Sequence, residues 1–340
     1  MKHIYNYSLD DLTTYFQEIK QKPFHAKQVY QWLYSKMVYD FEDMSNISKN
    51  LREQLNKEMV IDDLKIKEKQ VSQDGTIKYL FQLSDGHFIE SVLMIHDYGQ
   101  SLCVTSQVGC NMHCSFCASG LLKKQRDLTA GEMVNQIMAV SRDTGIRISH
   151  VVVMGTGEPF DNYDEVMKFV RIINQPHGLA IGARHITIST CGLVPMIERY
   201  SHEGIQTNLA ISLHAPNDLI RNQLMPVNQA FPMDQLRESI KKYIETTHRR
   251  VTFEYILLDG VNDSLVCARQ LAHYVKGLNA YVNLIPYNSV DEHRFSPSQN
   301  VEAFKDELLR LKVNCTVRKE HGRDIDGACG QLRAKRSGVI

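Results

Sequence analysis

The sequence contains few features that would place it in a membrane or outside the cell. No run of about 18 apolar residues, the length that a transmembrane helix needs, occurs among its 340 residues. Its start, MKHIYNYSLDDL, lacks the apolar core behind a basic end that a secretory signal peptide has. Low-complexity stretches and short-period repeats are missing as well. We therefore expect a soluble, cytoplasmic protein without a membrane partner.

Net charge is absent too, because 39 Lys and Arg residues balance 39 Asp and Glu residues. Neutrality by itself predicts no polyanionic partner, although it can hide local patches. The stretch 318–336 is such a patch, with six Lys and Arg residues against three acidic residues. A solvated basic tail is the simplest interpretation of it. The lysines around the first helical stretch lie either on a solvated face or against a nucleic-acid backbone, and both interpretations remain open. These lysines are Lys20, Lys22, Lys27 and Lys36.

The chain has enough hydrophobic residues, 43%, to bury one large domain with a small appendage. Residues 1–75 are predicted to form a small helical module, because apolar residues recur there at helical spacing: Phe24, Val29, Trp32, Leu33, Leu51 and Leu55. Alternating residues that turn at Asp85-Gly86 predict a β-hairpin over 76–98. Residues 99–340 then form the main domain.

The main domain alternates between β-rich runs and helical segments. The runs are 101–106, 148–154, 184–190, 207–213, 251–258, 281–286 and 313–318. Thr129 with Glu132 forms a capping box, Pro232 and Asp263 mark two further helix starts, and Gly277 marks a helix end. Strands separated by crossover helices predict an α/β fold with a parallel sheet, either doubly wound or closed toward a barrel.

The residues with distinctive chemistry favour the barrel, because each group follows an expected strand. The groups are a cysteine cluster after 101–106, Gly155-Thr156-Gly157-Glu158-Pro159, Ser189-Thr190, Ser212-Leu213-His214, Pro286-Tyr287-Asn288 and Cys329. In β/α barrels the active site is built from loops at the carboxyl ends of the strands. We therefore expect these groups to converge on one site.

The cysteines point to a metal or to catalysis, because eight cysteines in a chain without a signal peptide are expected to be reduced. Cys110, Cys114 and Cys117 have C-x3-C-x2-C spacing. They are one ligand short of a structural zinc site, and His113 is poorly placed beside Cys114 to complete it. On a four-iron cluster they leave one iron open, which can chelate the amino and carboxylate groups of a substrate.

With Phe116 before the last cysteine, this motif resembles the signature of radical S-adenosylmethionine (SAM) enzymes. The resemblance implies a partial (β/α)6 TIM-like barrel, a 4Fe-4S cluster on the three cysteines, and SAM that is cleaved to a 5′-deoxyadenosyl radical. Gly157-Glu158 resembles the contact to the SAM amino group. Gly155-Thr156-Gly157 lacks the third glycine of a dinucleotide-binding motif, which argues against a Rossmann methyltransferase.

Longer stretches resemble the RlmN/Cfr family of adenine methyltransferases, which act on 23S ribosomal RNA. The resemblance covers about Pro23 to Gln331, and its markers are 22–28, 32–34, 102–107 and 324–332. Gly327 stands where the family usually has alanine. The resemblance implies that module 1–75 is an RNA-binding accessory domain and that residues 99–340 form the radical SAM barrel with a C-terminal cysteine loop.

Carbon 2 of adenine is electron-poor and cannot attack a methyl cation, so another route is required. By the resemblance, one SAM methylates Cys329 and a second SAM gives the radical that removes a hydrogen from that S-methyl group. The methylene radical adds to the ring, and Cys103 releases the product as a Cys103–Cys329 disulfide forms. Glu90 resembles the acid/base residue. Without the resemblance, both cysteines would be interpreted as buried small apolar residues and Glu90 as an exposed strand residue.

The resemblance also assigns further SAM contacts: Ser189, Ser212, Leu213, His214 and Asn288. The leucine can contribute only backbone or packing, and a histidine at a strand end is often simply a core residue. We expect the remaining cysteines to be structural: Cys191, Cys267 and Cys315.

The similarity is greatest to the branch that methylates carbon 2 of adenosine 2503 in 23S ribosomal RNA and also adenosine 37 of transfer RNA. Pro159 after Gly157-Glu158 is typical of it, whereas the carbon-8, Cfr-like branch, which stays as an alternative, tends to have alanine there. The resemblance implies an electron donor such as flavodoxin or ferredoxin, and we expect a monomer.

Two hypotheses of other kinds are open. A zinc-stabilised RNA-binding protein without catalysis would use the same cysteine loop and basic tail. A radical SAM enzyme acting on a small metabolite would keep the cluster but would have no use for the N-terminal module or for two extra thiols.

Overall fold

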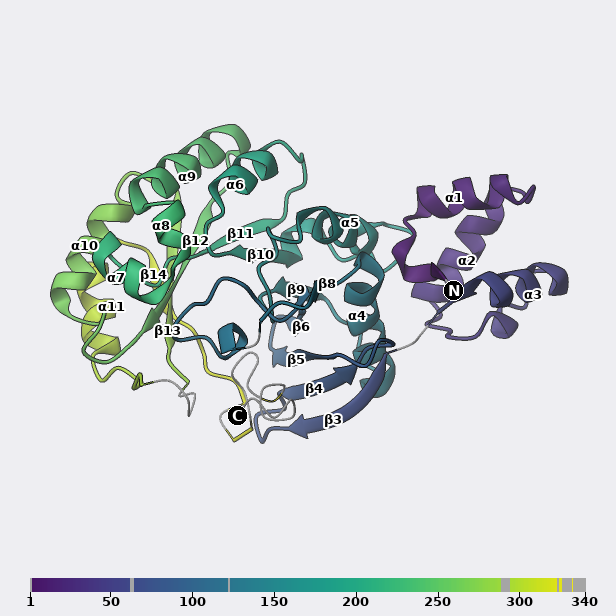
Figure 1. Cartoon of the computed structure of the whole chain (residues 1–340), viewed down its shortest axis with the longest axis horizontal. Coiled ribbons are helices and arrows are strands. Elements are labelled where there is room, and N and C mark those ends of the chain that lie inside the picture. The colour runs from purple at the N-terminus through teal and green to yellow at the C-terminus, as the bar shows by residue number, and fades with distance from the viewer. Residues whose placement is uncertain are drawn as a thin grey trace.

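The computed structural model describes residues 2–61, 64–121, 123–288, 294–322, 324–325 and 332. Within them a small module of helices lies beside a large α/β domain (Figure 1). None of the described helices is both long and apolar enough to cross a membrane.

The N-terminal module is helical, as its apolar spacing predicts. Its elements are β1 (Lys2–His3), η1 (Ile4–Asn6), α1 (Leu9–Glu18), α2 (Phe24–Tyr34), η2 (Phe41–Asp43), α3 (Lys49–Glu58) and β2 (Met59–Val60). Val29 and Leu33 are buried, but Phe24, expected on the same face, is 52% exposed. Phe24 lies five residues before Val29, about 140° around the helix, and therefore falls off the apolar face.

The large domain is built on a ten-stranded sheet within the described residues. Its strands are β3 (Lys65–Val71), β4 (Ile77–Gln82), β5 (Phe88–His96), β6 (Gly99–Cys103), β9 (His150–Val153), β10 (Ile186–Thr190), β11 (Asn208–Ser212), β12 (Val251–Leu257), β13 (Ala280–Pro286) and β14 (Cys315–Val317). The spatial order is β14-β13-β12-β11-β10-β9-β6-β5-β4-β3. β6 and β9 to β14 are parallel, while β3, β4 and β5 extend the sheet antiparallel from β6.

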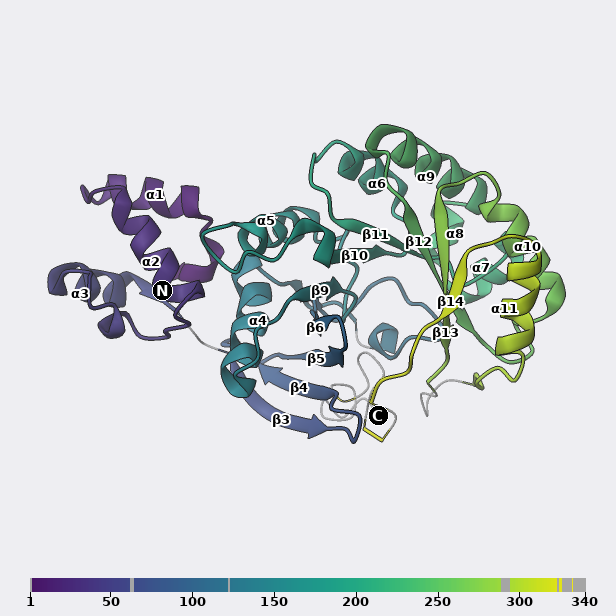
Figure 2. The same ribbon diagram turned by 180° about the vertical axis from the view of Figure 1, so that it is seen from behind.

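Helices cover the outer face of the curved sheet (Figures 1 and 2). They are α4 (Ala130–Thr144), α5 (Tyr163–Asn174), α6 (Val194–Ser201), α7 (Asp218–Leu224), α8 (Val227–Ala230), α9 (Met233–Thr247), α10 (Leu265–Val275) and α11 (Val301–Arg310). Short elements complete the domain: β7 (Gln107–Val108), η3 (Ala118–Leu121), β8 (Arg126–Asp127) and η4 (Ala183–His185). This alternation confirms the predicted partial (β/α)6 barrel, which the sheet order leaves open between β14 and β3.

The predicted local signals are largely confirmed. Thr129 and Glu132 form both hydrogen bonds of the capping box at the start of α4, and Pro232 caps α9. The N-cap of α10 is Ser264, one residue after the predicted Asp263, because the Ser264 hydroxyl accepts the backbone N–H of Cys267. β4 and β5 pair across Asp85-Gly86 as the expected hairpin.

β3 was not predicted from the sequence, and it joins the sheet at Lys65, inside the stretch 1–75 assigned to the helical module. Most of its residues are exposed, with lysines at alternate positions in KIKEKQV. A polar strand at the edge of a sheet lacks the apolar alternation by which strands are recognised, although lysine on an edge protects against aggregation.

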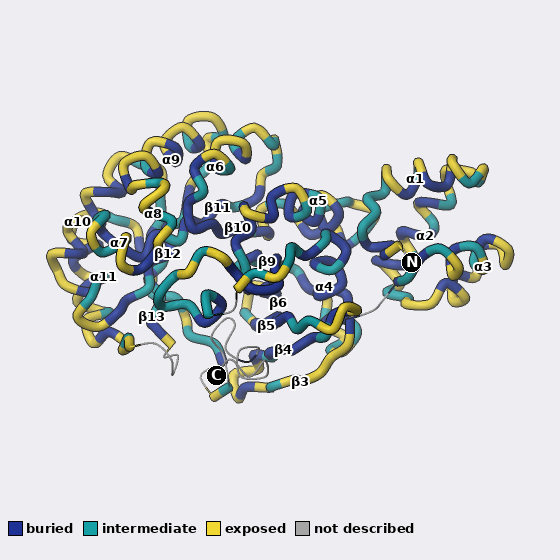
Figure 3. The backbone as a smooth tube through the Cα atoms, in the orientation of Figure 1, coloured by how far each residue is buried: buried dark blue, intermediate teal, exposed yellow. Residues whose placement is uncertain are grey.

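The buried residues are concentrated in the strands and on the inner faces of the helices (Figure 3).

A close backbone contact joins the N-terminal module to α4. The Gly131 N–H donates to the side-chain oxygen of Asn6 over 2.6 Å. A Cβ atom on Gly131 would lie 2.7 Å from Asn6 Oδ1 and 2.8 Å from the Asn6 backbone nitrogen. Glycine at the start of α4 is therefore required for the module to dock in this position.

We expect Gly131→Ala to loosen the module and to lower the free energy of unfolding by about 1–3 kcal/mol, because the added methyl group overpacks this contact. Hydrogen exchange should show reduced protection of α1 and α2, and thermal denaturation should measure the loss. Gly182→Ala is the control, because an added Cβ meets nothing within 4 Å there. Equal protection in both variants would contradict the docking role.

Candidate active site

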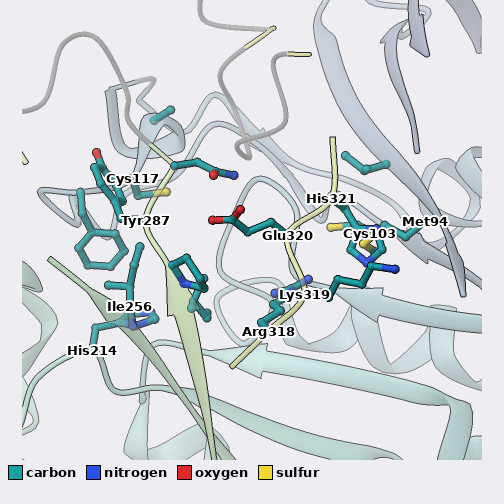
Figure 4. Close-up of a pocket in the computed structure, with 16 residues that line it drawn as sticks. Met94, Cys103, Cys117, His214, Ile256, Tyr287, Arg318, Lys319, Glu320 and His321 are labelled. Carbon is teal, nitrogen blue, oxygen red and sulfur yellow. The ribbon is translucent and has the colours of Figure 1, made fainter. Parts of the chain in front are cut away.

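Two adjoining cavities lie where the carboxyl ends of the parallel strands meet, as predicted. The first, the thiol cavity, has a volume of about 200 Å³ and is lined by predicted site residues: Cys110, Cys114, Cys117, Gly157, Glu158, Ser189, Ser212 and His214. The second, the Cys103 cavity, has a volume of about 260 Å³, and Cys103, Cys117, His214 and Asn288 line it (Figure 4). The cavities share a wall that includes Phe116, Cys117 and His214.

The cysteine loop is held by its backbone. His113 has a φ of 53°, the Cys117 N–H donates to the Cys114 carbonyl over 3.2 Å, and Ser115 N–H donates to Leu224 of α7 over 2.9 Å. Burial raises the pKa of the Cys110 thiol to about 12 and that of Cys114 well above its usual value. Buried thiols of this kind need a cation to become thiolates, which iron supplies, and Cys117 lines the same cavity. The donor set therefore fits an iron-sulfur cluster.

Glu158 is a buried carboxylate that lines the thiol cavity. Its Oε1 accepts the Phe160 N–H over 2.9 Å, and its Oε2 accepts the Cys191 N–H over 2.7 Å. Burial nevertheless raises its pKa, and these hydrogen bonds offset only part of that shift. Glu158 thus joins the loops after β9 and β10, a structural role that the sequence did not reveal. An ammonium group beside it would relieve the buried charge.

Gly157 allows the loop after β9 to pass close to β7. Its φ is 112°, and a Cβ atom would lie 2.7 Å from the Gln107 Cβ. The Glu158 N–H donates to the Gln107 side-chain oxygen over 2.8 Å. Because residue 157 is a glycine, the loop can place the Glu158 carboxylate at the thiol cavity.

The serines and Leu213 have different positions. The hydroxyl oxygens of Ser189 and Ser212 are 3.3 Å apart, and both residues line the thiol cavity. Leu213 is buried and lies outside the described lining of either cavity. Its N–H donates to the Glu254 carbonyl over 3.1 Å, and its carbonyl accepts Arg221 Nε over 3.2 Å. Leu213 therefore holds the loop through its backbone.

His214 lines both cavities and is held as a neutral ring. Its Nδ1 accepts the Ile256 N–H over 3.1 Å, so Nε2 carries the proton. Burial, with a smaller contribution from Arg221, lowers its pKa to about 3. The ring packs edge-on against Phe116 at 4.9 Å between centroids. His214 is thus a fixed N–H donor over the physiological pH range.

Arg221 of α7 was missed by the sequence analysis. It is fully buried, and its guanidinium donates to the Leu213 carbonyl, to Asn228 Oδ1 over 2.8 Å and to the Cys191 carbonyl over 2.6 Å. It therefore joins the loops after β10 and β11 and places a positive charge near Cys114. No local motif distinguishes this arginine from a solvated one, because its acceptors are backbone atoms of distant loops.

Cys103 and Glu90 lie on one face of the sheet. Cys103 pairs with Val92, and Glu90 is two residues from Val92 along β5. Lys78, which pairs with the other side of Val92, places its Nζ 3.2 Å from Glu90 Oε2. Lys78 and Glu90 are both buried, so Glu90 is not the exposed strand residue that its sequence position alone favours.

The first part of the predicted basic tail is part of the site. Arg318 donates its N–H to the Leu284 carbonyl over 2.7 Å and lines both cavities, so a solvated tail is the wrong interpretation for it. Lys319 and His321 line the Cys103 cavity (Figure 4).

Cys329 lies outside the described residues. The chain before it is anchored, because Asp324 accepts hydrogen bonds from the Ser72 hydroxyl and the Gln73 N–H.

Comparison with known proteins agrees with this geometry. Residues 2–61 match the family described as "Ribosomal RNA large subunit methyltransferase N-terminal domain", and residues 104–267 match the Radical SAM superfamily. A relative from Spiroplasma citri, "Probable dual-specificity RNA methyltransferase RlmN", is 55% identical over 343 residues and covers 100% of this chain and 99% of its own. A relative of the same name from Streptococcus thermophilus is 55% identical, covering 97% of this chain and 88% of its own.

A solved structure has the same fold throughout. The radical SAM methyltransferase from Sphaerobacter thermophilus superposes with a TM-score of 0.93 at 40% identity, covering 97% of this chain and 99% of that one. The chain belongs to the RlmN family of radical SAM methyltransferases. RlmN-family membership makes it a SAM-dependent enzyme that uses a 4Fe-4S cluster, and it removes the alternative of a non-catalytic zinc protein.

We expect Arg221→Met to lower the free energy of unfolding by at least about 2 kcal/mol, because several buried carbonyls lose a charged donor. SAM binding to the reconstituted enzyme should weaken as well, since the loops after β10 and β11 are no longer joined. Chemical denaturation and equilibrium dialysis measure the two effects. Arg199→Met is the control, because its ion pair with Asp164 is largely exposed and should contribute little to stability. Equal effects of the two variants on stability and on SAM binding would contradict this role of Arg221.

Proposed function

We propose that this chain methylates carbon 2 of an adenosine in 23S ribosomal RNA, position 2503 by the family resemblance, and also adenosine 37 of transfer RNA. The relatives from Spiroplasma citri and Streptococcus thermophilus bear names that state dual specificity for RNA, and their identity over nearly the whole chain supports the same substrate class. One observation carries the proposal. Cys103 and Cys117, which the sequence separates, line one cavity.

The thiol cavity is the proposed site of the cofactors. Cys110, Cys114 and Cys117 hold the cluster, and Glu158 is placed to accept the SAM ammonium. The other proposed SAM contacts are Gly157, Ser189, Ser212 and His214, with Asn288 from the adjoining Cys103 cavity and Leu213 acting through its backbone. When bound, the cluster reduces SAM and the cleavage gives the 5′-deoxyadenosyl radical.

The Cys103 cavity is the proposed site of the RNA base. Cys329 carries the methyl group that becomes the new methylene bridge to carbon 2, and Cys103 resolves the adduct. Radical addition leaves one unpaired electron on the ring and the original hydrogen on carbon 2; the electron passes to the cluster, which SAM cleavage has oxidised, and a base takes the proton. The Cys103 sulfur then attacks the Cys329 sulfur, the S–S bond forms, and the carbon–sulfur bond breaks, so that the methylene carbon keeps the electron pair and takes a proton. The anchoring of Asp324 on the β3–β4 turn supports this role, because Asp324 follows the cavity-lining His321 by three residues and precedes Cys329 by five.

Glu90 is the proposed acid/base residue. Its carboxylate is two residues from Val92 on the face that Cys103 shares, and the Lys78 ammonium holds it at 3.2 Å. A buried ion pair contributes little net stability compared with apolar side chains of similar size. The position of this pair on the face that carries Cys103 therefore favours a role in proton transfer over a role in folding.

Further parts of the proposal rest on the family. Residues 1–75 act as an RNA-binding accessory domain, and the match of residues 2–61 supports this role. We propose a cytoplasmic monomer that receives electrons from a flavodoxin or a ferredoxin. Carbon-8 methylation of the same adenosine is the second candidate product, favoured by the cysteine pair, which both branches of the family use.

We expect Cys103→Ala to trap RNA covalently on the protein, because the methylene bridge forms and the resolving thiol is missing. Cys329→Ala should trap no RNA, since it cannot carry the methyl group. Denaturing gel electrophoresis with radiolabelled RNA, after incubation with SAM and reductant, separates the two outcomes. Trapping by both variants, or by neither, would contradict the assignment.

We expect the wild-type enzyme to form 2-methyladenosine in ribosomal RNA and transfer RNA. Digestion of the treated RNA and mass spectrometry against 2-methyladenosine and 8-methyladenosine standards identifies the product. Cys114→Ala is the matched control and should lose both the visible absorbance of the cluster and all methylation. Mainly 8-methyladenosine would overturn the choice of carbon, and a full cluster in Cys114→Ala would remove that cysteine as a ligand.

A further inference from the structure

Five aromatic side chains form a continuous row outside the proposed cofactor site. In order they are His321, His96, Tyr98, His150 and His185, which we call the aromatic row. The successive ring centroids are 4.8, 4.6, 5.3 and 4.2 Å apart. Two of the pairs, His96 with Tyr98 and His150 with His185, are stacked.

The row follows from the pairing of the strands. His96 ends β5, Tyr98 directly precedes β6, His150 begins β9 and His185 directly precedes β10. β5 is antiparallel to β6, while β9 and β10 are parallel to it, so these positions meet at the amino ends of the parallel strands. Neighbouring strands lie about 4.8 Å apart, which matches the spacing of the rings.

Much of the row is accessible. Tyr98 is 69% exposed, His185 is exposed, and His96 and His150 are half-buried. Rings of this size on a protein surface, arranged side by side across four elements, offer more apolar area than isolated exposed residues do.

The row also leads to the proposed RNA site. His321 lines the Cys103 cavity, and Figure 4 shows it beside Cys103 and Met94. His96 lies two residues after Met94 on β5, so both side chains point to the same face of the strand. The aromatic row therefore begins at the wall of the Cys103 cavity and runs to the amino end of β10.

The electrostatics suit a nucleic acid. Burial and neighbouring positive groups, among them Arg318 and Lys319, lower the pKa of His96 and His321, and burial with His185 lowers that of His150. Exposed Arg184 adjoins His185. Two acidic residues also face this region: Asp74, 3.6 Å from His321, and exposed Asp97. The Asp74 carboxylate already accepts hydrogen bonds from the Gly322 and Thr76 N–H groups. The imidazoles with lowered pKa values thus favour the uncharged form that stacks on bases, while the cations attract phosphates.

We propose that the aromatic row is a stacking surface for the unpaired nucleotides of the RNA substrate that flank the target adenosine. The inference rests on the proposed RNA methylation. An enzyme that reacts at a base takes it out of the helix, which also leaves its neighbours without full stacking. Aromatic side chains bind such nucleotides with little dependence on sequence, because every base has a flat apolar face.

The test measures RNA affinity of the full, cluster-loaded enzyme by fluorescence anisotropy, with a short single-stranded RNA and with the same RNA annealed into a duplex. We expect Tyr98→Ala and His185→Ala each to weaken single-strand binding on the order of tenfold, as loss of one stacked base does. Tyr98→Phe keeps the ring and should keep the affinity. His273→Ala is the matched control for His185→Ala, because His273 is exposed on α10, away from the row.

Three further measurements make the result decisive. Duplex affinity, iron content and SAM cleavage without RNA should be the same in all variants, because Tyr98 and His185 are outside the described lining of both cavities. Unchanged single-strand affinity in both Tyr98→Ala and His185→Ala, or an equal loss for duplex and single strand, would overturn the proposal. If Tyr98→Ala fails to fold, His185→Ala at the end of the row carries the test. Failure of the wild-type enzyme to bind or methylate RNA would instead refute the proposed function.

Discussion

The strands β6 and β9 to β14 are paired in parallel. Each connection between them must therefore cross the outer face of the sheet, so that every strand starts at the same end. Residues at the carboxyl ends of these strands therefore lie together whatever their distance in sequence. Cys117 and Glu158 come from two loops, Ser212 ends β11 and Ile285 lies near the end of β13, and all four line one cavity for this reason. The proposed chemistry depends on this backbone constraint more than on any single side chain.

Buried polar contacts then fix the loops relative to one another. Glu158 accepts hydrogen bonds from its own loop and from Cys191, while Arg221 reaches Cys191 and the loop after β11. Both side chains are ionisable and buried, and a charge on either is costly unless hydrogen bonds compensate. These contacts keep the cavity walls in place without filling the cavity, which apolar packing between the same loops would do.

The sequence predicted the parts of the fold and site that leave local signals. Alternation, capping residues and the C-x3-C-x2-C spacing are read within a few residues, and they located the barrel strands, α4 and the thiol cavity. Arg221, Lys78 and the lining role of Arg318 left no such signal, because their partners are distant in sequence or are backbone atoms. β3 was missed for a related reason, since an exposed edge strand has no apolar face to detect.

The antiparallel extension of the sheet accounts for the second cavity. A parallel barrel alone places loops at its mouth, but it supplies no side chains from a strand running the other way. β5 pairs with β6 on the open side and brings Glu90, Val92 and Met94 to the face that carries Cys103. The wall shared by the two cavities contains Cys117 and His214, so the proposed cofactor site and the proposed resolving thiol are adjacent but separate. Such a separation gives the radical and the thiol chemistry different surroundings while leaving the RNA base within reach of both.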